Sequence, residues 1–121
     1  MIVFTNNPKV RSAFYGSELK FVEGQYLDVL IKVRDEIHKH FKLLTHPLSG
    51  SIKPNETPYK SIAIEPCDML DINSLMMIEN AILVHDKLVN DKPTPEWSDR
   101  ILEDFMIIDL DLFYHAVVKS V

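Results

Sequence analysis

Residues 25–41, which read QYLDVLIKVRDEIHKHF, predict an amphipathic helix around which the rest of the fold must be arranged. The apolar side chains recur at spacings of three and four: Tyr26, Leu30, Val33, Ile37 and Phe41. Most of the charged side chains fall on the opposite side. A stripe with this period is typical of a helix that lies on a hydrophobic core.

The chain before this helix predicts two short strands with a short helix between them. Residues 2–5 (IVFT) are rich in β-forming side chains and are followed by turn formers. Asn7 is placed to cap a helix over residues 8–15, with Pro8 at its first position and Gly16 at its end. Residues 19–22 form the second expected strand.

The chain after residue 41 predicts two further strands and two long helices. We expect strands at 43–45 and 61–64, separated by an irregular stretch, 46–59, that contains three prolines. Asp71 is expected to cap a helix over 72–90, and Thr94 to cap a last helix that begins at Pro95. The expected core residues of these two helices are Ile72, Leu75, Met76, Ala81, Ile82 and Leu83, then Trp97, Ile101, Phe105, Ile108, Leu112 and Ala116.

This order of elements favours an α/β fold in one domain, residues 1–121. The expected sheet is small, open and mostly parallel, with about four short strands, helices on its faces and two long C-terminal helices. Helical crossovers make the first three strands parallel, whereas the direction of the fourth is left open. A mainly helical domain with a small ribbon is the alternative.

Composition and charge exclude several classes of protein. Among 121 residues, 46% are hydrophobic and 26% charged, which excludes a disordered chain. The net charge of −5 argues against a nucleic-acid partner bound by phosphate neutralisation. No apolar run approaches the length of a membrane span or of a signal-peptide core, so we expect a cytoplasmic protein with no membrane partner. Cys67 is the single cysteine, so no internal disulfide can form.

The densest polar groups follow the first and third expected strands, where an α/β sheet binds ligands if those strands are neighbours. They are Asn6, Asn7, His46, Ser49, Gly50, Ser51, Lys53, Asn55 and Thr57. Hydroxyls, backbone N–H groups and the Lys53 ammonium suit a small anionic metabolite. The alternative is that the 46–57 loop satisfies its own backbone.

The sequence contains no recognisable catalytic, cofactor or metal signature. The P-loop, dinucleotide-binding, H-E-x-x-H and C-x-x-C patterns are absent, so we expect no cofactor and no metal. An enzyme that uses His46 with Glu65 or Cys67 ranks below a binding protein. The group Met69, Met76 and Met77 is either core or a soft face for a partner, and a homodimer through the C-terminal helices stays open.

Three segments resemble the GrdX family, whose members are encoded beside glycine, sarcosine and betaine reductase components in anaerobic, amino-acid-fermenting bacteria. They are 5–8 (TNNP), 23–35 (EG followed by YLDVLIKVRD) and 44–59 (LTHPLSGS, then KPNETPY). The resemblance covers the first half of the chain. It implies a cytosolic role connected with the reductase system, and it supplies no functional residues. A non-catalytic accessory protein that docks onto a reductase component is therefore the alternative to a metabolite-binding protein.

Overall fold

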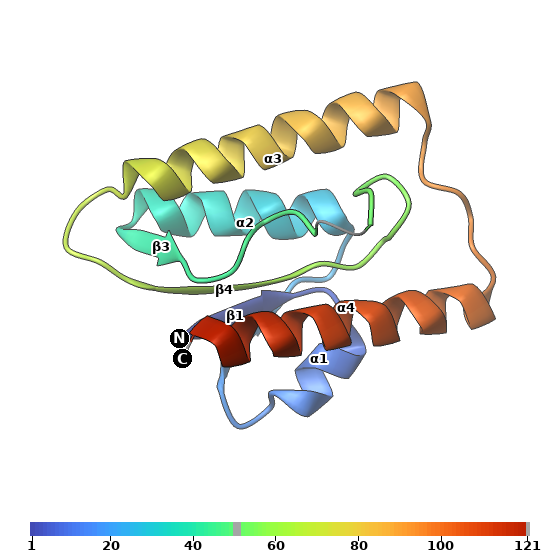
Figure 1. The fold of residues 1–121 in the computed structure, drawn as a ribbon, viewed down its shortest axis with the longest axis horizontal. Coiled ribbons are helices and arrows are strands. Elements are labelled where there is room, and N and C mark those ends of the chain that lie inside the picture. The colour runs from blue at the N-terminus through green and yellow to red at the C-terminus, as the bar shows by residue number, and fades with distance from the viewer. Residues whose placement is uncertain (50–51, 121) are drawn as a thin grey trace.

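The structure is a computed structural model that describes residues 1–49 and 52–120, with the side chains described up to Val118 (Figure 1). The elements follow one another as β1 (Ile2–Thr5), α1 (Pro8–Ala13), β2 (Glu18–Phe21), α2 (Tyr26–His38), β3 (Phe41–Leu43), β4 (Ser61–Pro66), α3 (Ile72–Asp91) and α4 (Asp99–Ser120). The expected α/β class is confirmed, as are four short strands and two long C-terminal helices.

The four strands form one mixed sheet in the order β2-β1-β4-β3, so the expectation of a mostly parallel sheet is wrong. β1 is parallel to β2, with Ile2 opposite Glu18, but β4 is antiparallel to both of its neighbours, β1 and β3. The described residues between β3 and β4 form no crossover helix, and β4 runs antiparallel to β3. β4 thereby separates β1 from β3, which are not neighbours.

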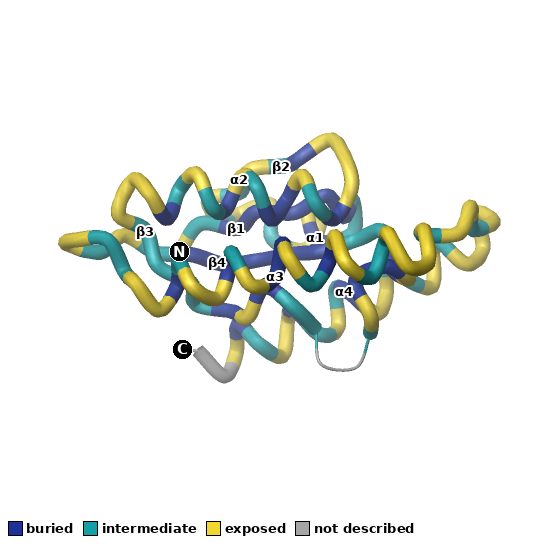
Figure 2. Tube along the Cα trace, turned by 90° about the horizontal axis from the view of Figure 1, so that it is seen from above, coloured by how far each residue is buried: buried dark blue, intermediate teal, exposed yellow. Residues whose placement is uncertain are grey.

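The helices cover the two faces of the sheet in pairs (Figure 1). α2 and α3 pack on the face to which Phe4, Ile62 and Ile64 point. α1 and α4 pack on the opposite face, where Val3 and Ala63 lie. The alternation of side chains along β1 and β4 therefore supplies two hydrophobic cores, and Figure 2 shows both strands as buried between the helices.

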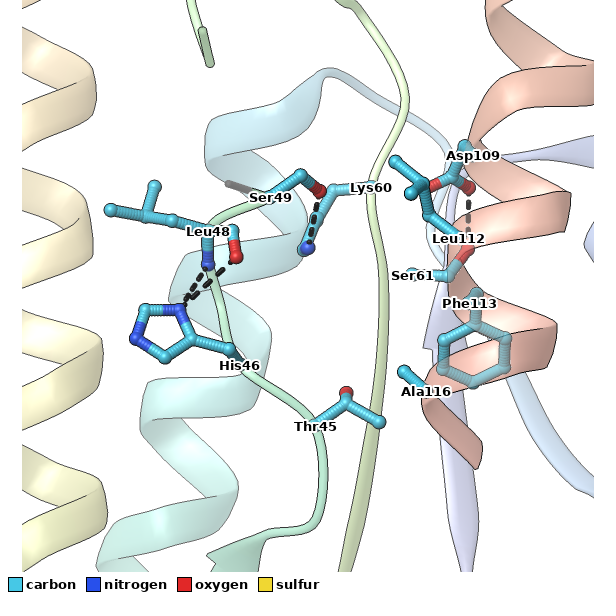
Figure 3. A pocket seen from close by; sticks show the side chains of 10 residues that line it. All are labelled: Thr45, His46, Leu48, Ser49, Lys60, Ser61, Asp109, Leu112, Phe113 and Ala116. Atoms are coloured by element: carbon cyan, nitrogen blue, oxygen red, sulfur yellow. Dashed lines mark hydrogen bonds between the residues drawn. The ribbon is translucent and has the colours of Figure 1, made fainter. Parts of the chain in front are cut away.

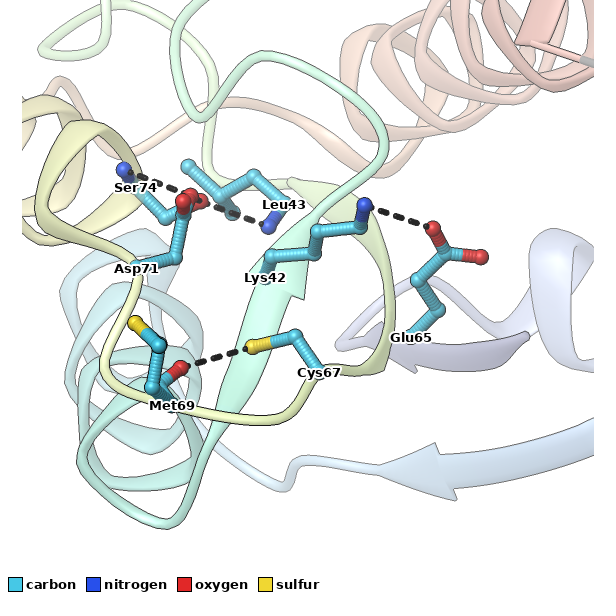
Figure 4. Close-up of polar contacts among 7 residues, drawn as sticks. All are labelled: Lys42, Leu43, Glu65, Cys67, Met69, Asp71 and Ser74. Atoms are coloured by element: carbon cyan, nitrogen blue, oxygen red, sulfur yellow. Dashed lines mark hydrogen bonds and ion pairs between the residues drawn. The ribbon is translucent and has the colours of Figure 1, made fainter.

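Two predicted helix caps are confirmed and the third is wrong. The Asn7 side chain accepts a hydrogen bond from Lys9 N at 3.0 Å, and Asp71 accepts one from Ser74 N at 3.1 Å (Figure 4). The last helix begins at Asp99 rather than at Pro95. The indole of Trp97 donates to the carbonyl of Glu56 at 2.7 Å, and this bond holds the chain before α4 against the 53–58 loop.

The predicted core stripe of α4 is displaced, because buried Asp109, Phe113 and Val117 form the inner row of the helix. Two members of the predicted stripe, Ile101 and Ile108, are exposed. Because the buried row includes an aspartate, the apolar periodicity of the sequence predicted the wrong face of α4.

On α3 the predicted apolar arc is only partly buried. Ala81 and Ile82 are in the core, but Ile72, Met76 and Leu83 are 55%, 66% and 69% exposed. In the described part of the chain no helix is long and apolar enough to cross a membrane.

Candidate functional site

A cavity of about 180 Å³ lies where the loop after β3, the beginning of β4 and the middle of α4 meet (Figure 3). Its wall combines polar groups with an apolar side supplied by α4. The lining residues are Thr45, His46, Leu48, Ser49, Lys60, Ser61, Asp109, Leu112, Phe113 and Ala116. This is room for a ligand of a few heavy atoms.

A chain of hydrogen bonds runs from behind the cavity to the carboxylate of Asp109 in its wall. The backbone N–H of Asn7 donates to Thr5 Oγ1 at 3.0 Å, and Thr5 Oγ1 lies 2.6 Å from Ser61 Oγ. Ser61 Oγ donates to Asp109 Oδ2 at 2.8 Å, and Asn7 Nδ2 donates to the same oxygen at 3.0 Å. These bonds fix the position of a carboxyl group that is only 6% exposed.

Burial raises the pKa of Asp109, since it removes the carboxylate from water. The hydrogen bonds from Asn7 and Ser61 and the positive charge of Lys60 oppose this rise. The protonation of buried Asp109 therefore depends on the hydrogen bonds that it accepts and on the charge of Lys60.

Lys60 is the cation of the cavity, and it is only 5% exposed. Its backbone N–H donates to Asn6 Oδ1 at 2.9 Å, while its side chain reaches across to the loop, where Nζ donates to Ser49 Oγ at 3.1 Å (Figure 3). Burial lowers the pKa of Lys60 to about 8, although the charge of Asp109 opposes the change. Among the described residues no ion pair joins Lys60 to a carboxylate.

His46 and Ser49, both predicted as site residues, line this cavity. His46 Nδ1 lies 3.0 Å from Leu48 N and 3.1 Å from the Leu48 carbonyl oxygen, so the imidazole is held against the backbone of its own loop (Figure 3). Gly50 and Ser51, the next two predicted residues, lie outside the described residues.

Asn6 and Asn7 lie behind the cavity and organise its frame. Asn6 Nδ2 donates to the carbonyls of Gly24 and Pro58, at 3.1 and 2.8 Å. Asn7 caps α1 and also donates to the carbonyl of Met106 at 2.9 Å, which ties the end of β1 to α4. Both side chains are buried and occupied by protein partners.

The other three predicted residues are not brought to this cavity. Lys53 is exposed. Asn55 is buried on the far side of the loop, where its Nδ2 donates to the carbonyl of Lys92 at 3.0 Å. Thr57 accepts from Tyr59 N–H at 3.3 Å within its own turn.

Among the polar residues that line the cavity, sequence reasoning missed Thr45, Lys60, Ser61 and Asp109. Asp109 carried a readable signal, because it is the acidic member of the row that continues with Phe113 and Val117 at spacings of four. Lys60 carried less, since a lysine directly before a strand is usually at the surface. In the described chain no group of three His, Cys, Asp or Glu side chains could hold a metal ion.

Cys67 lies away from this cavity, just after β4 (Figure 4). Its Sγ donates to the carbonyl of Met69 at 3.1 Å. The hypothesis of a Cys67–His46 pair has no contact between the two side chains to support it.

The fold and the cavity define a class of small α/β proteins with a mixed four-stranded sheet, paired helices on each face and a polar pocket at the loop before β4. The chain belongs to the GrdX family: the family model described as GrdX-like protein matches residues 2–118. The match extends the resemblance carried by the first half of the chain across both C-terminal helices. No curated protein and no solved structure gives a significant match.

Proposed function

We propose that this protein binds a small anionic metabolite in the cavity between the 46–57 loop and α4, and that Lys60 is the counter-charge. One observation carries the proposal: a buried ammonium faces a cavity while its hydrogen-bond partner is a neutral hydroxyl, Ser49. Burying an ammonium whose direct partner is a neutral hydroxyl is costly even with the charge of Asp109 nearby, and a bound anion would lower that cost.

Asp109 restricts which anions can bind in the cavity. Its carboxyl group lines the same cavity, so a ligand with a second negative charge there would be repelled. A ligand that presents an anionic group to Lys60 and a hydrogen-bond donor to Asp109 satisfies both residues. Small hydroxy acids and amino acids have this pattern, and acetate does not.

The test is a thermal-shift panel of acetate, glycolate, glycine, betaine and phosphate on the full chain. A ligand at 100 times its dissociation constant adds about 2.7 kcal/mol, which at this size is a shift of roughly 10 °C. Glycolate or glycine should stabilise the protein more than acetate does. A panel without any shift would overturn the proposal.

The matched variants are Lys60→Met and Lys53→Met, which each remove one lysine from the same region. Lys53 is exposed, so its removal should leave the ligand shift intact, whereas removal of buried Lys60 should abolish it. The opposite result would return the role to Lys53 and refute the assignment of Lys60.

A second candidate is a non-catalytic accessory protein that docks onto a component of the glycine, sarcosine or betaine reductase system in the cytoplasm of an anaerobe. The favouring observation is the exposed apolar face of α3 and the turn before it, formed by Met69, Ile72, Met76 and Leu83. Methionine-rich exposed faces adapt well to partners.

Its test is co-purification of the reductase components with the wild type and with Met76→Glu. The variant places a charge on an exposed position, so it should fold normally and lose the partner. Equal recovery of the reductase components with both proteins would exclude this face as the docking surface. Sedimentation of the purified chain shows whether the protein instead forms a homodimer.

A further inference from the structure

We propose that Lys60 also forms an imine with small uncharged aldehydes that enter the cavity. This is a covalent chemistry of the same pocket, and it does not require that the anion proposal be correct. The two use different states of one side chain: the ammonium holds an anion, and the neutral amine attacks a carbonyl carbon.

The geometry supplies what an imine-forming lysine needs. Nζ is held by the Ser49 hydroxyl at 3.1 Å, which fixes the end of an otherwise flexible side chain. The cavity of about 180 Å³ admits an aldehyde of a few heavy atoms and has an apolar side, Leu112 and Phe113, for its alkyl part. Desolvation keeps a larger share of the amine neutral than it is in water, since it lowers the pKa of Lys60 to about 8.

The reaction is balanced without any oxidant or reductant. The Nζ lone pair attacks the carbonyl carbon, a C–N bond forms as the C=O π bond breaks and its electron pair moves to oxygen, and one proton passes from nitrogen to that oxygen. The resulting carbinolamine takes a proton on its hydroxyl group and expels water, which leaves an iminium ion. The iminium ion loses its remaining N–H proton to give the imine.

Asp109 is placed to support the charged intermediate. Its carboxyl group lines the same cavity as Lys60, and its negative charge acts on that side chain. While deprotonated, Asp109 lies in the wall of the same cavity as the iminium cation, whose charge it offsets.

The experiment is reductive trapping of the wild type with limiting propionaldehyde and cyanoborohydride at pH 7.5, followed by peptide mapping. A lysine of pKa about 8 is roughly one-quarter neutral at this pH, compared with about 0.1% for a lysine of ordinary pKa. We expect alkylation of Lys60 at least about tenfold faster than that of Lys53, the exposed lysine of the same loop. Repeating the reaction in urea should abolish the preference, because it depends on the fold.

Lys60 modified no faster than Lys53 would overturn the proposal, as would a preference that survives unfolding. The outcome is separable from that of the anion panel. Trapping at Lys60 without any anion shift supports imine formation alone, and an anion shift without trapping refutes imine formation alone.

Discussion

Replacement of Lys60 by methionine should make the folded protein more stable at neutral pH. Lys60 is a buried ammonium, and its pKa falls from the ordinary 10.5 to about 8. Methionine fills a similar volume without a charge, so Lys60→Met removes the cost of burying the charge. The hydrogen bond to Ser49 is lost at the same time.

The size of the effect follows from the two pKa values. A difference of about 2.5 units corresponds to about 3 kcal/mol at pH 7, where both the folded and the unfolded chain carry the proton. Between pH 8 and 10.5 the Lys60 side chain binds more protons in the unfolded than in the folded chain, so the destabilising contribution of Lys60 shrinks as the pH rises. The penalty falls to about 2 kcal/mol at pH 9 and about 1 kcal/mol at pH 10. Loss of the Ser49 hydrogen bond offsets about 1 kcal/mol, so the net gain at pH 7 is about 2 kcal/mol.

The assay is urea denaturation of wild type, Lys60→Met and Lys53→Met at pH 7, 9 and 10. The gap between wild type and Lys60→Met should shrink steadily with pH. Lys53→Met should stay within about 0.5 kcal/mol of the wild type throughout. A gap that is independent of pH, or a Lys60→Met protein that is less stable at pH 7, would refute the reasoning.

Three further predictions concern the site and its frame. Anion affinity should fall about tenfold from pH 7 to pH 9, because only about one-tenth of Lys60 is protonated at pH 9. Titration calorimetry measures the affinity at both pH values, and an equal affinity at the two would contradict this prediction. His40→Gly should stabilise the protein by about 0.5–1 kcal/mol in thermal unfolding, because His40 has a left-handed φ of 70°, while Lys39→Gly (φ −95°) should give no gain. Asn7→Ala should cost about 2–3 kcal/mol in urea denaturation, since it removes the α1 cap and a hydrogen-bond donor to buried Asp109. A loss below about 1 kcal/mol would show that the Asn7 side chain does not hold this network together.

Local signals in the sequence predict the elements well where side-chain chemistry acts within a few residues. Asn7-Pro8 and Asp71 mark helix starts that the structure confirms, and residues 2–5 form β1 as expected. The start of α4 could not be read in this way. The bond from Trp97 to Glu56 joins positions 41 residues apart, and no local pattern reveals it.

The topology and the site depend on such long-range contacts. Thr5 pairs with Ser61 across the sheet, 56 residues further along the chain. The composition of the loop before β4 is like that of many surface loops, so the sequence does not predict this register. The same pairing brings Ser61 to Asp109 and leaves Lys60 at the cavity. The polar loop therefore predicted the correct region through His46 and Ser49. The charged residues of the cavity, Lys60 and Asp109, lie beside a strand and on an apolar helix, where sequence patterns give no reason to expect a site.

The most direct test of the central claim is the number of protons taken up when the anion that stabilises the protein most is titrated at pH 8. Calorimetry in two buffers of different ionisation enthalpy gives this number. If the anion pairs with Lys60, it raises the pKa of a half-protonated amine, so about half a proton should be taken up at pH 8 and almost none at pH 6. Binding without proton uptake at pH 8 would show that the anion lies elsewhere and would contradict the account.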